Sequence, residues 1–110
     1  MDLFFKSKKL ASVMGDEGAL KRAYGDRNAR EIRCRLAVLC AVPSLAEVPR
    51  LRPERCHPIT GPLVGRFAVD VLDPFRLVFE PAPGSPIGRG GRVNLAKVTA
   101  IVILEIVDYH

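Results

Sequence analysis

The last three residues of the chain, Asp108, Tyr109 and His110, carry side chains that can take up or release protons. A carboxylate, a phenol and an imidazole are groups that general acid–base catalysis uses. They directly follow an apolar run, KVTAIVILEIV, at residues 97–107. A solvated polar tail is the simpler interpretation of such an ending. The alternative is that the apolar run holds a strand rigidly and its end carries the three groups into a site.

Cys56 and His57 form a second pair of chemically active residues. No other cysteine or histidine lies at metal-ligand spacing from them, so we expect no metal site, and a histidine beside a proline is typical of a capped loop. Cys34 and Cys40 lie in one predicted helix with their Cα atoms roughly 9 Å apart, too far for a disulfide. We therefore expect three buried thiols.

The chain is basic, and most of its cations are arginine. Its 17 Lys and Arg exceed its 12 Asp and Glu by 5, and 12 of the 17 are Arg, whose planar guanidinium suits phosphate. The excess favours encounters with polyanions such as nucleic acid, although ordinary solubilising charge is an equal alternative. A length of 110 residues predicts one domain, 1–110. Without a signal peptide or a run of ~18 apolar residues, we expect a cytoplasmic protein with no membrane partner.

The N-terminal half predicts one strand followed by a helical hairpin. DLFFK at residues 2–6 is typical of a short strand, and the apolar spacing from Leu10 onward is typical of helix. Asp16 is a predicted helix cap and Gly25 a predicted stop, with Leu20 and Ala23 facing inward. Because the connection at Gly25 is short, we expect the two flanking helices to pack antiparallel.

The longest predicted helix runs from an N-cap at Asp26 to a stop at Pro43. Its apolar stripe comprises Ala29, Ile32, Leu36 and Leu39. Four arginines take up its other faces, where a solvated role is more common than a binding role: Arg27, Arg30, Arg33 and Arg35.

The C-terminal half predicts irregular chain and then strands. The proline-rich segment 43–53 should be irregular. GRFAVDVL and FRLVFE alternate apolar and polar residues on either side of a turn at Asp73 and Pro74, which indicates a β-hairpin. The segment PAPGSPIGRGG, residues 81–91, is expected to be a mobile loop, a connector rather than a binding surface for Arg89 and Arg92.

The final run from Lys97 to Val107 suits a central strand covered on both faces. The element order therefore describes a small α/β (α+β) domain. It would have an N-terminal strand, a helical hairpin, and then an antiparallel sheet of three to four strands that wraps the hairpin.

Three segments, RCHPITGPLVG, RFAVDVLDPFRLVFEP and the terminal ILEIVDYH, resemble HigB-type toxins of the RelE/ParE superfamily. The resemblance implies a RelE-like fold and a metal-independent endoribonuclease, an mRNA interferase of a type II toxin-antitoxin system. Such a toxin enters the A site of the 70S ribosome and cuts mRNA. It also implies a HigA-like antitoxin, acidic or of helix-turn-helix type, in a toxin-antitoxin hetero-oligomer. No cofactor is implied.

RNA cleavage without a metal needs the 2′-OH deprotonated, the phosphorane charge stabilised and the leaving 5′-oxygen protonated. The resemblance assigns these tasks to His57, Arg76, Asp108, Tyr109 and His110. The histidines would carry protons, Arg76 would grip the scissile phosphate, and Asp108 would orient a histidine. Tyr109 would need neighbouring cations to ionise, or would stack on a base. Without the resemblance, Arg76 is expected to pair with Asp70 or Glu80 across the hairpin.

Arg52, Arg55 and Arg66 are predicted RNA-binding residues. HigB-type proteins commonly carry charged residues in the segment that reads ITGPLVG here, and each missing cation removes one phosphate contact unless these arginines substitute. Arg66 shares a face with Arg76 only if the hairpin loop has an odd number of residues. The positions in question in that segment are Thr60, Pro62, Leu63 and Val64.

Two other functions stay open. The basic helices also fit a ParE-like, non-catalytic toxin that binds DNA gyrase. The loss of loop cations fits an inactive module that binds its antitoxin and nothing else.

Overall fold

The computed structural model describes residues 1–59, 65–86 and 93–108. Within these residues five strands form one sheet in the order β1-β5-β4-β3-β2. Neighbouring strands are antiparallel except for β1, which pairs with β5 in parallel. The strands are β1 (Asp2–Phe5), β2 (His57–Pro58), β3 (Phe67–Asp70), β4 (Phe75–Pro81) and β5 (Ala100–Asp108). The structure thus confirms a mixed α+β class with an N-terminal strand. The four strands that follow the helices, β2 to β5, are antiparallel as expected, and β1 joins the same sheet as a parallel edge, which the sequence pattern did not predict.

Three helices are present in these residues: α1 (Lys8–Met14), α2 (Glu17–Tyr24) and α3 (Asp26–Ala41). Asp16 caps α2 as expected, its side chain accepting a hydrogen bond from the Gly18 amide. The predicted cap at Asp26 is wrong. Gly25, with a φ of +86° that other residues rarely adopt, itself occupies the N-cap position of α3, which has no side-chain cap.

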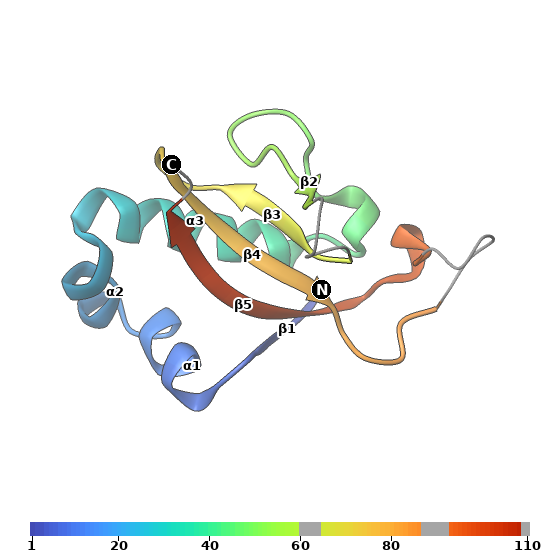
Figure 1. Ribbon diagram of the computed structural model, residues 1–110, viewed down its shortest axis with the longest axis horizontal. Helices are drawn as coiled ribbons and strands as arrows, with labels where there is room; N and C mark the ends of the chain where they lie inside the picture. The colour runs from blue at the N-terminus through green and yellow to red at the C-terminus, as the bar shows by residue number, and fades with distance from the viewer. Residues whose placement is uncertain (60–64, 87–92, 109–110) are drawn as a thin grey trace.

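The helices α2 and α3 form the expected antiparallel hairpin. Arg33 pairs with Glu17 at 3.3 Å, and the two residues lie equally far from Gly25 along the chain. Figure 1 shows α3 lying across one face of the sheet, with α1 and α2 gathered toward one end of it. The hairpin therefore covers the sheet on that face.

The core lies between α2, α3 and this covered face. Leu20, Ile32 and Leu39 are completely or almost completely buried against Leu77, Phe79, Ile101 and Ile103 of β4 and β5. The predicted stripe of α3 is confirmed, with Leu36 half-buried at its margin. Ala23 was expected to face inward but is exposed, because Leu20 and Tyr24 occupy the inward positions of the short α2.

The predicted hairpin of β3 and β4 is confirmed, with Asp70 opposite Arg76. The last strand is central, as expected, but it is covered on one face only. Ile101 and Ile103 are buried, whereas Val102 and Leu104 are half-buried and Glu105 is exposed. The strand begins at Ala100 rather than at Lys97, because residues Leu95–Lys97 form a short 3-10 helix, η4.

Two further expectations need correction. Cys34 and Cys40 are exposed free thiols rather than buried ones, because they lie on the outer side of α3, while Cys56 is half-buried. The segment 43–53 is not wholly irregular, since it contains the 3-10 helix η1 (Leu45–Glu47), and its Leu45 and Val48 are buried in the core.

In the predicted loop 81–91, Pro81 still belongs to β4, whereas residues 87–92, with Arg89 and Arg92, lie outside the described part. None of the described helices is long and apolar enough to cross a membrane.

Candidate functional site

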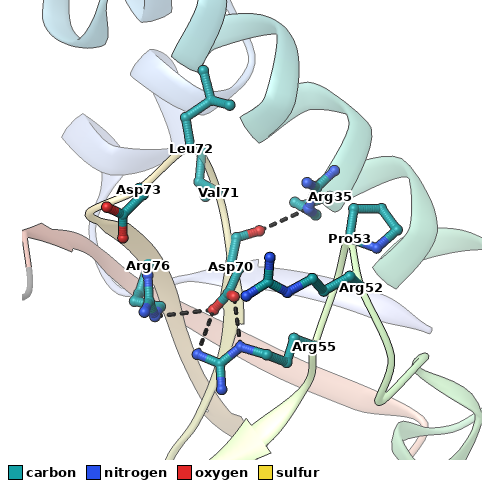
Figure 2. A pocket seen from close by; sticks show the side chains of 9 residues that line it. All are labelled: Arg35, Arg52, Pro53, Arg55, Asp70, Val71, Leu72, Asp73 and Arg76. Atoms are coloured by element: carbon teal, nitrogen blue, oxygen red, sulfur yellow. Dashed lines mark hydrogen bonds and ion pairs between the residues drawn. The ribbon is translucent and has the colours of Figure 1, made fainter.

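A hollow with a volume of about 830 Å³ lies beside the turn that joins β3 to β4. It is shallow, and arginine dominates its lining. Side chains reach it from α3, from the segment before β2 and from both strands of the hairpin (Figure 2). We call it the arginine hollow; its lining residues are Arg35, Arg52, Pro53, Arg55, Asp70, Val71, Leu72, Asp73 and Arg76.

The carboxylate of Asp70 lies at the centre of the arginine hollow and holds two guanidinium groups. Arg55 grips it with two bonds, Nε to Oδ2 at 2.6 Å and Nη2 to Oδ1 at 3.0 Å. Arg76 forms an ion pair with the same carboxylate, with its Nε 2.9 Å from Oδ1. Charge-assisted bonds with this fork geometry are the stronger hydrogen bonds of proteins. Figure 2 shows the two guanidinium groups approaching Asp70 from different sides.

Arg35 forms the floor of the hollow from α3. Its Nε donates to the backbone carbonyl of Asp70 at 2.7 Å, and its Nη1 pairs with Glu31 at 3.0 Å. Arg35 is only 5% exposed, so its predicted solvated position is wrong. It has the helical spacing of the apolar stripe, between Ile32 and Leu39, and this spacing turns it toward the sheet. Buried charges in proteins are paired and hydrogen-bonded in this way.

Arg52 stands at the rim of the hollow and has no hydrogen bond or ion pair with any residue of the described ranges (Figure 2). Among the lining residues four arginines face two aspartates, an excess of two positive charges. Arg55 and Arg76 keep unused N–H donors on their outer sides, because each guanidinium has five. The hollow can therefore bind an anion with several oxygen atoms, such as a phosphate.

Arg55 holds an unusual backbone conformation, with a φ of +44°. An L residue in this left-handed region is held there by its surroundings, and such residues cluster at functional sites. Here the side-chain hydrogen bonds to Asp70 hold Arg55 and raise the pKa of its guanidinium, with a further contribution from the charge of Asp70. Its carbonyl accepts a 2.7 Å hydrogen bond from Nδ1 of His57.

His57 lies in a different and much smaller space. This histidine pocket has a volume of about 80 Å³ and is lined by Leu45, Arg50, Cys56, His57, Pro58, Phe67 and Leu95. Because a carbonyl only accepts, Nδ1 of His57 carries a proton, and in the neutral ring Nε2 is left as an acceptor. Burial raises the pKa of the Cys56 thiol to about 11, with the charge of Arg50 acting weakly in the opposite direction. The thiol is therefore a poor nucleophile.

The other predicted site residues are separated from the hollow or lie outside the described part. Arg66 pairs with Glu80 at 3.7 Å. Residues 71–75, an odd number, separate the paired Asp70 and Arg76, so Arg66 does share a face with Arg76. The register places Asp108 opposite Phe75, on the face of the sheet other than that of Arg76. Tyr109 and His110 lie outside the described residues, and so do positions 60–64, where HigB-type proteins commonly carry charged residues.

The structure thus brings Arg52, Arg55 and Arg76 together in one hollow. His57 is hydrogen-bonded to the backbone carbonyl of Arg55 but lines the separate histidine pocket, and Asp108 lies on the other face of the sheet. Arg76 pairs with Asp70, which is the arrangement expected without any family resemblance. Sequence reasoning missed two residues of the hollow, Asp70 as its centre and Arg35 as its floor. The place of Arg35 between apolar positions of α3 was a signal that could have found it.

In residues 1–59, 65–86 and 93–108, no group of three or more His, Cys, Asp or Glu side chains is arranged to hold a metal ion. No protein family, no curated protein and no solved structure matches the chain. The class that the fold defines is a mixed α+β domain. Its function must be inferred from the arginine hollow and the histidine pocket.

Proposed function

We propose that the protein is a toxin of a type II toxin-antitoxin system, with a RelE-like fold, that cleaves mRNA on the ribosome. The observation that carries the proposal is the arginine hollow, which four arginines line and in which two of them, Arg55 and Arg76, hold the carboxylate of Asp70. Guanidinium is the side chain best suited to grip a phosphate with two bonds. The resemblance of RCHPITGPLVG, RFAVDVLDPFRLVFEP and ILEIVDYH to HigB-type toxins supplies the reaction.

In the proposed reaction a base removes the proton of the ribose 2′-OH, and the 2′-oxygen attacks the adjacent phosphorus. The bond from phosphorus to the 5′-oxygen breaks, and an acid protonates that oxygen. The products are a 2′,3′-cyclic phosphate and a 5′-hydroxyl. No metal or cofactor takes part. Guanidinium groups would stabilise the negative charge that develops on the phosphate oxygens.

The roles follow from the chemistry of each residue. Arg76, with Arg55 and Arg52, would bind the phosphodiester, and Arg66 would add a contact farther along the strand. His57 supports a proton-transfer role through its free Nε2, which the bond to the Arg55 carbonyl fixes as an acceptor in the neutral ring. The ending of β5, with Asp108, Tyr109 and His110, would supply the second proton carrier and its orienting carboxylate.

A second function is favoured by one observation. Among its described lining residues the arginine hollow has no histidine and no tyrosine. This composition suits binding without catalysis, as in a ParE-like toxin acting on DNA gyrase, or a module that binds its antitoxin alone. Gyrase supercoiling assays decide between the first two functions. Inhibited supercoiling with intact mRNA supports the ParE-like function, and unaffected supercoiling with cleaved mRNA supports the nuclease.

The proposed partner is an antitoxin whose acidic segment covers the basic hollow in the cytoplasm. The test of the whole proposal is growth inhibition by the chain expressed without an antitoxin. We expect the parent to arrest growth and His110→Ala and Tyr109→Phe to relieve the arrest. Equal arrest by the parent and both variants, at equal protein levels, would contradict the assignment of these residues.

A further inference from the structure

We propose that Asp70 is a built-in anion that occupies the phosphate seat of the arginine hollow, and that a bound RNA phosphate displaces its carboxylate from Arg55 and Arg76. This inference rests on the proposed function, because it takes the hollow to be the site where RNA phosphate binds. Asp70 would then set the affinity of the site: it keeps the guanidinium groups in place and competes with the ligand.

The first support is the geometry of the clamp. Both oxygens of Asp70 are engaged: Oδ1 accepts a 3.0 Å hydrogen bond from Arg55 and lies 2.9 Å from Nε of Arg76 in an ion pair. One oxygen shared between two guanidinium groups is an arrangement that a phosphate oxygen can take over, because it has the same charge and the same accepting lone pairs. The carboxylate is also accessible to a competitor, since the Asp70 side chain is 18% exposed at the centre of an open hollow.

The second support is that only the carboxylate is free to move. The amide of Asp70 donates to the carbonyl of Glu54 at 2.8 Å, and the Asp70 carbonyl accepts from the buried Arg35 at 2.7 Å. These bonds fix the main chain on both sides. A rotation of the side chain can therefore release Arg55 and Arg76 without a change in the fold, while the floor formed by Arg35 stays in place.

The third support is the charge balance. With Asp70 ionised the lining carries an excess of two positive charges, and replacing it by a neutral residue raises the excess to three. The neighbouring pair on the same sheet differs, since Arg66 and Glu80 are 3.7 Å apart and both side chains are more exposed than those of Arg76 and Asp70. Such a loose surface pair does not hold its partner in one geometry. The clamp on Asp70 is therefore specific to the hollow.

The test compares Asp70→Asn with a variant that adds the same charge elsewhere. Asp2→Asn is the matched control, because Asp2 is exposed on β1, at the edge of the sheet away from β2 and β3. Binding of a fluorescent single-stranded RNA of about 12 nucleotides is measured over a range of salt concentrations. For Asp70→Asn we expect the slope of log affinity against log salt to steepen by roughly 0.7, and the affinity near 0.15 M salt to rise about fourfold. Binding no tighter than that of Asp2→Asn would overturn the inference.

A second measurement uses the parent protein and does not depend on a variant that folds. The side-chain Nε–H signals of Arg35, Arg55 and Arg76 are followed by NMR while the same RNA is added. We expect the signals of Arg55 and Arg76 to shift as their bonds to Asp70 are lost, and that of Arg35 to stay in place. Three unchanged signals, or three that shift alike, would overturn the inference.

The two proposals fail in different ways. If 5′-end mapping finds no cleaved mRNA but Asp70→Asn still binds RNA more tightly, the nuclease is wrong and the displaced carboxylate stands. If the parent cleaves mRNA and Asp70→Asn binds RNA no more tightly, the proposal that phosphate displaces the Asp70 carboxylate is wrong, and the nuclease proposal is unaffected.

Discussion

The arginine hollow and the histidine pocket differ in volume, in charge and in the types of residue that line them. The hollow is about 830 Å³, open and cationic, and has no histidine or tyrosine among its described lining residues. The pocket is about 80 Å³, is bordered mainly by apolar side chains, and contains the imidazole of His57 beside a suppressed thiol. The hollow has room for a phosphate with its sugar, whereas the pocket has room for a few water molecules at most.

The guanidinium groups and the imidazole of His57 therefore line two separate spaces in this fold. Arg55 joins them, because its guanidinium lies in the hollow and its carbonyl orients His57. A phosphate bound by Arg55 would therefore lie next to the segment that carries the imidazole. The following predictions test the hollow and the histidine pocket separately.

The largest expected effect comes from removing the floor of the hollow. Arg35→Met should lower the free energy of unfolding by about 3 kcal/mol, because it leaves the Asp70 carbonyl and Glu31 without their buried partner. Arg33→Met on the same helix is the control, since Arg33 pairs only at the surface and should cost less than about 1 kcal/mol. Urea unfolding measures both. Equal losses in the two variants would show that Arg35 has no special role.

The histidine pocket should be closed to reagents that reach the rest of the surface. Burial raises the pKa of Cys56 from 9.0 to about 11, so at pH 8 its thiolate fraction is about a hundredfold below that of an ordinary thiol. Iodoacetamide should modify the exposed Cys34 and Cys40 first, as mass spectrometry of timed samples would show. RNA bound only in the hollow should leave the rate at which iodoacetamide modifies Cys56 unchanged.

The same shift gives a pH dependence with a definite sign. The folded protein holds the Cys56 proton more tightly than the unfolded chain does. Its contribution to stability is therefore complete below pH 9 and is lost as pH rises toward 11. Urea midpoints between pH 8 and pH 11 should fall less steeply in Cys56→Ala than in the parent. Parallel curves would indicate that the thiol is not shielded.

The smallest expected effect concerns the rim of the hollow. Arg52→Gln removes a cation that has no partner in the described ranges, so it should weaken RNA binding without altering stability. The salt slope should fall by roughly 0.7 and the affinity near 0.15 M salt by about fourfold. Arg22→Gln, on the exposed surface of α2, is the matched control. Equal effects of the two substitutions would mean that RNA binds by diffuse charge and not in the hollow.

Much of the fold follows from local patterns in the sequence. The stripe of α3, the stop at Gly25 and the hairpin at Asp73 and Pro74 depend on neighbours in the chain, and each is found in the structure. The parallel pairing of β1 with β5 joins the two ends of the chain, and no local pattern contains it. In the candidate site, too, some contacts follow from local pattern and others depend on long-range packing.

Arg76 opposite Asp70 follows from strand alternation, because both lie in one hairpin. The approach of Arg35 and Arg55 depends on how α3 and the segment before β2 pack on that hairpin, which residue types alone do not determine. The expected convergence of His57 with Arg76 assumed one cleft, whereas the packing of Leu45 and Phe67 around His57 forms a second one.

The most direct test of the nuclease is the mapping of mRNA 5′ ends after the untagged chain is induced in cells without an antitoxin. We expect new 5′ ends within translated regions for the parent and for Arg22→Gln, and their loss in Arg76→Gln, with folding of each variant checked by thermal unfolding. Growth arrest with intact mRNA, or equal cleavage by a folded Arg76→Gln, would contradict the account.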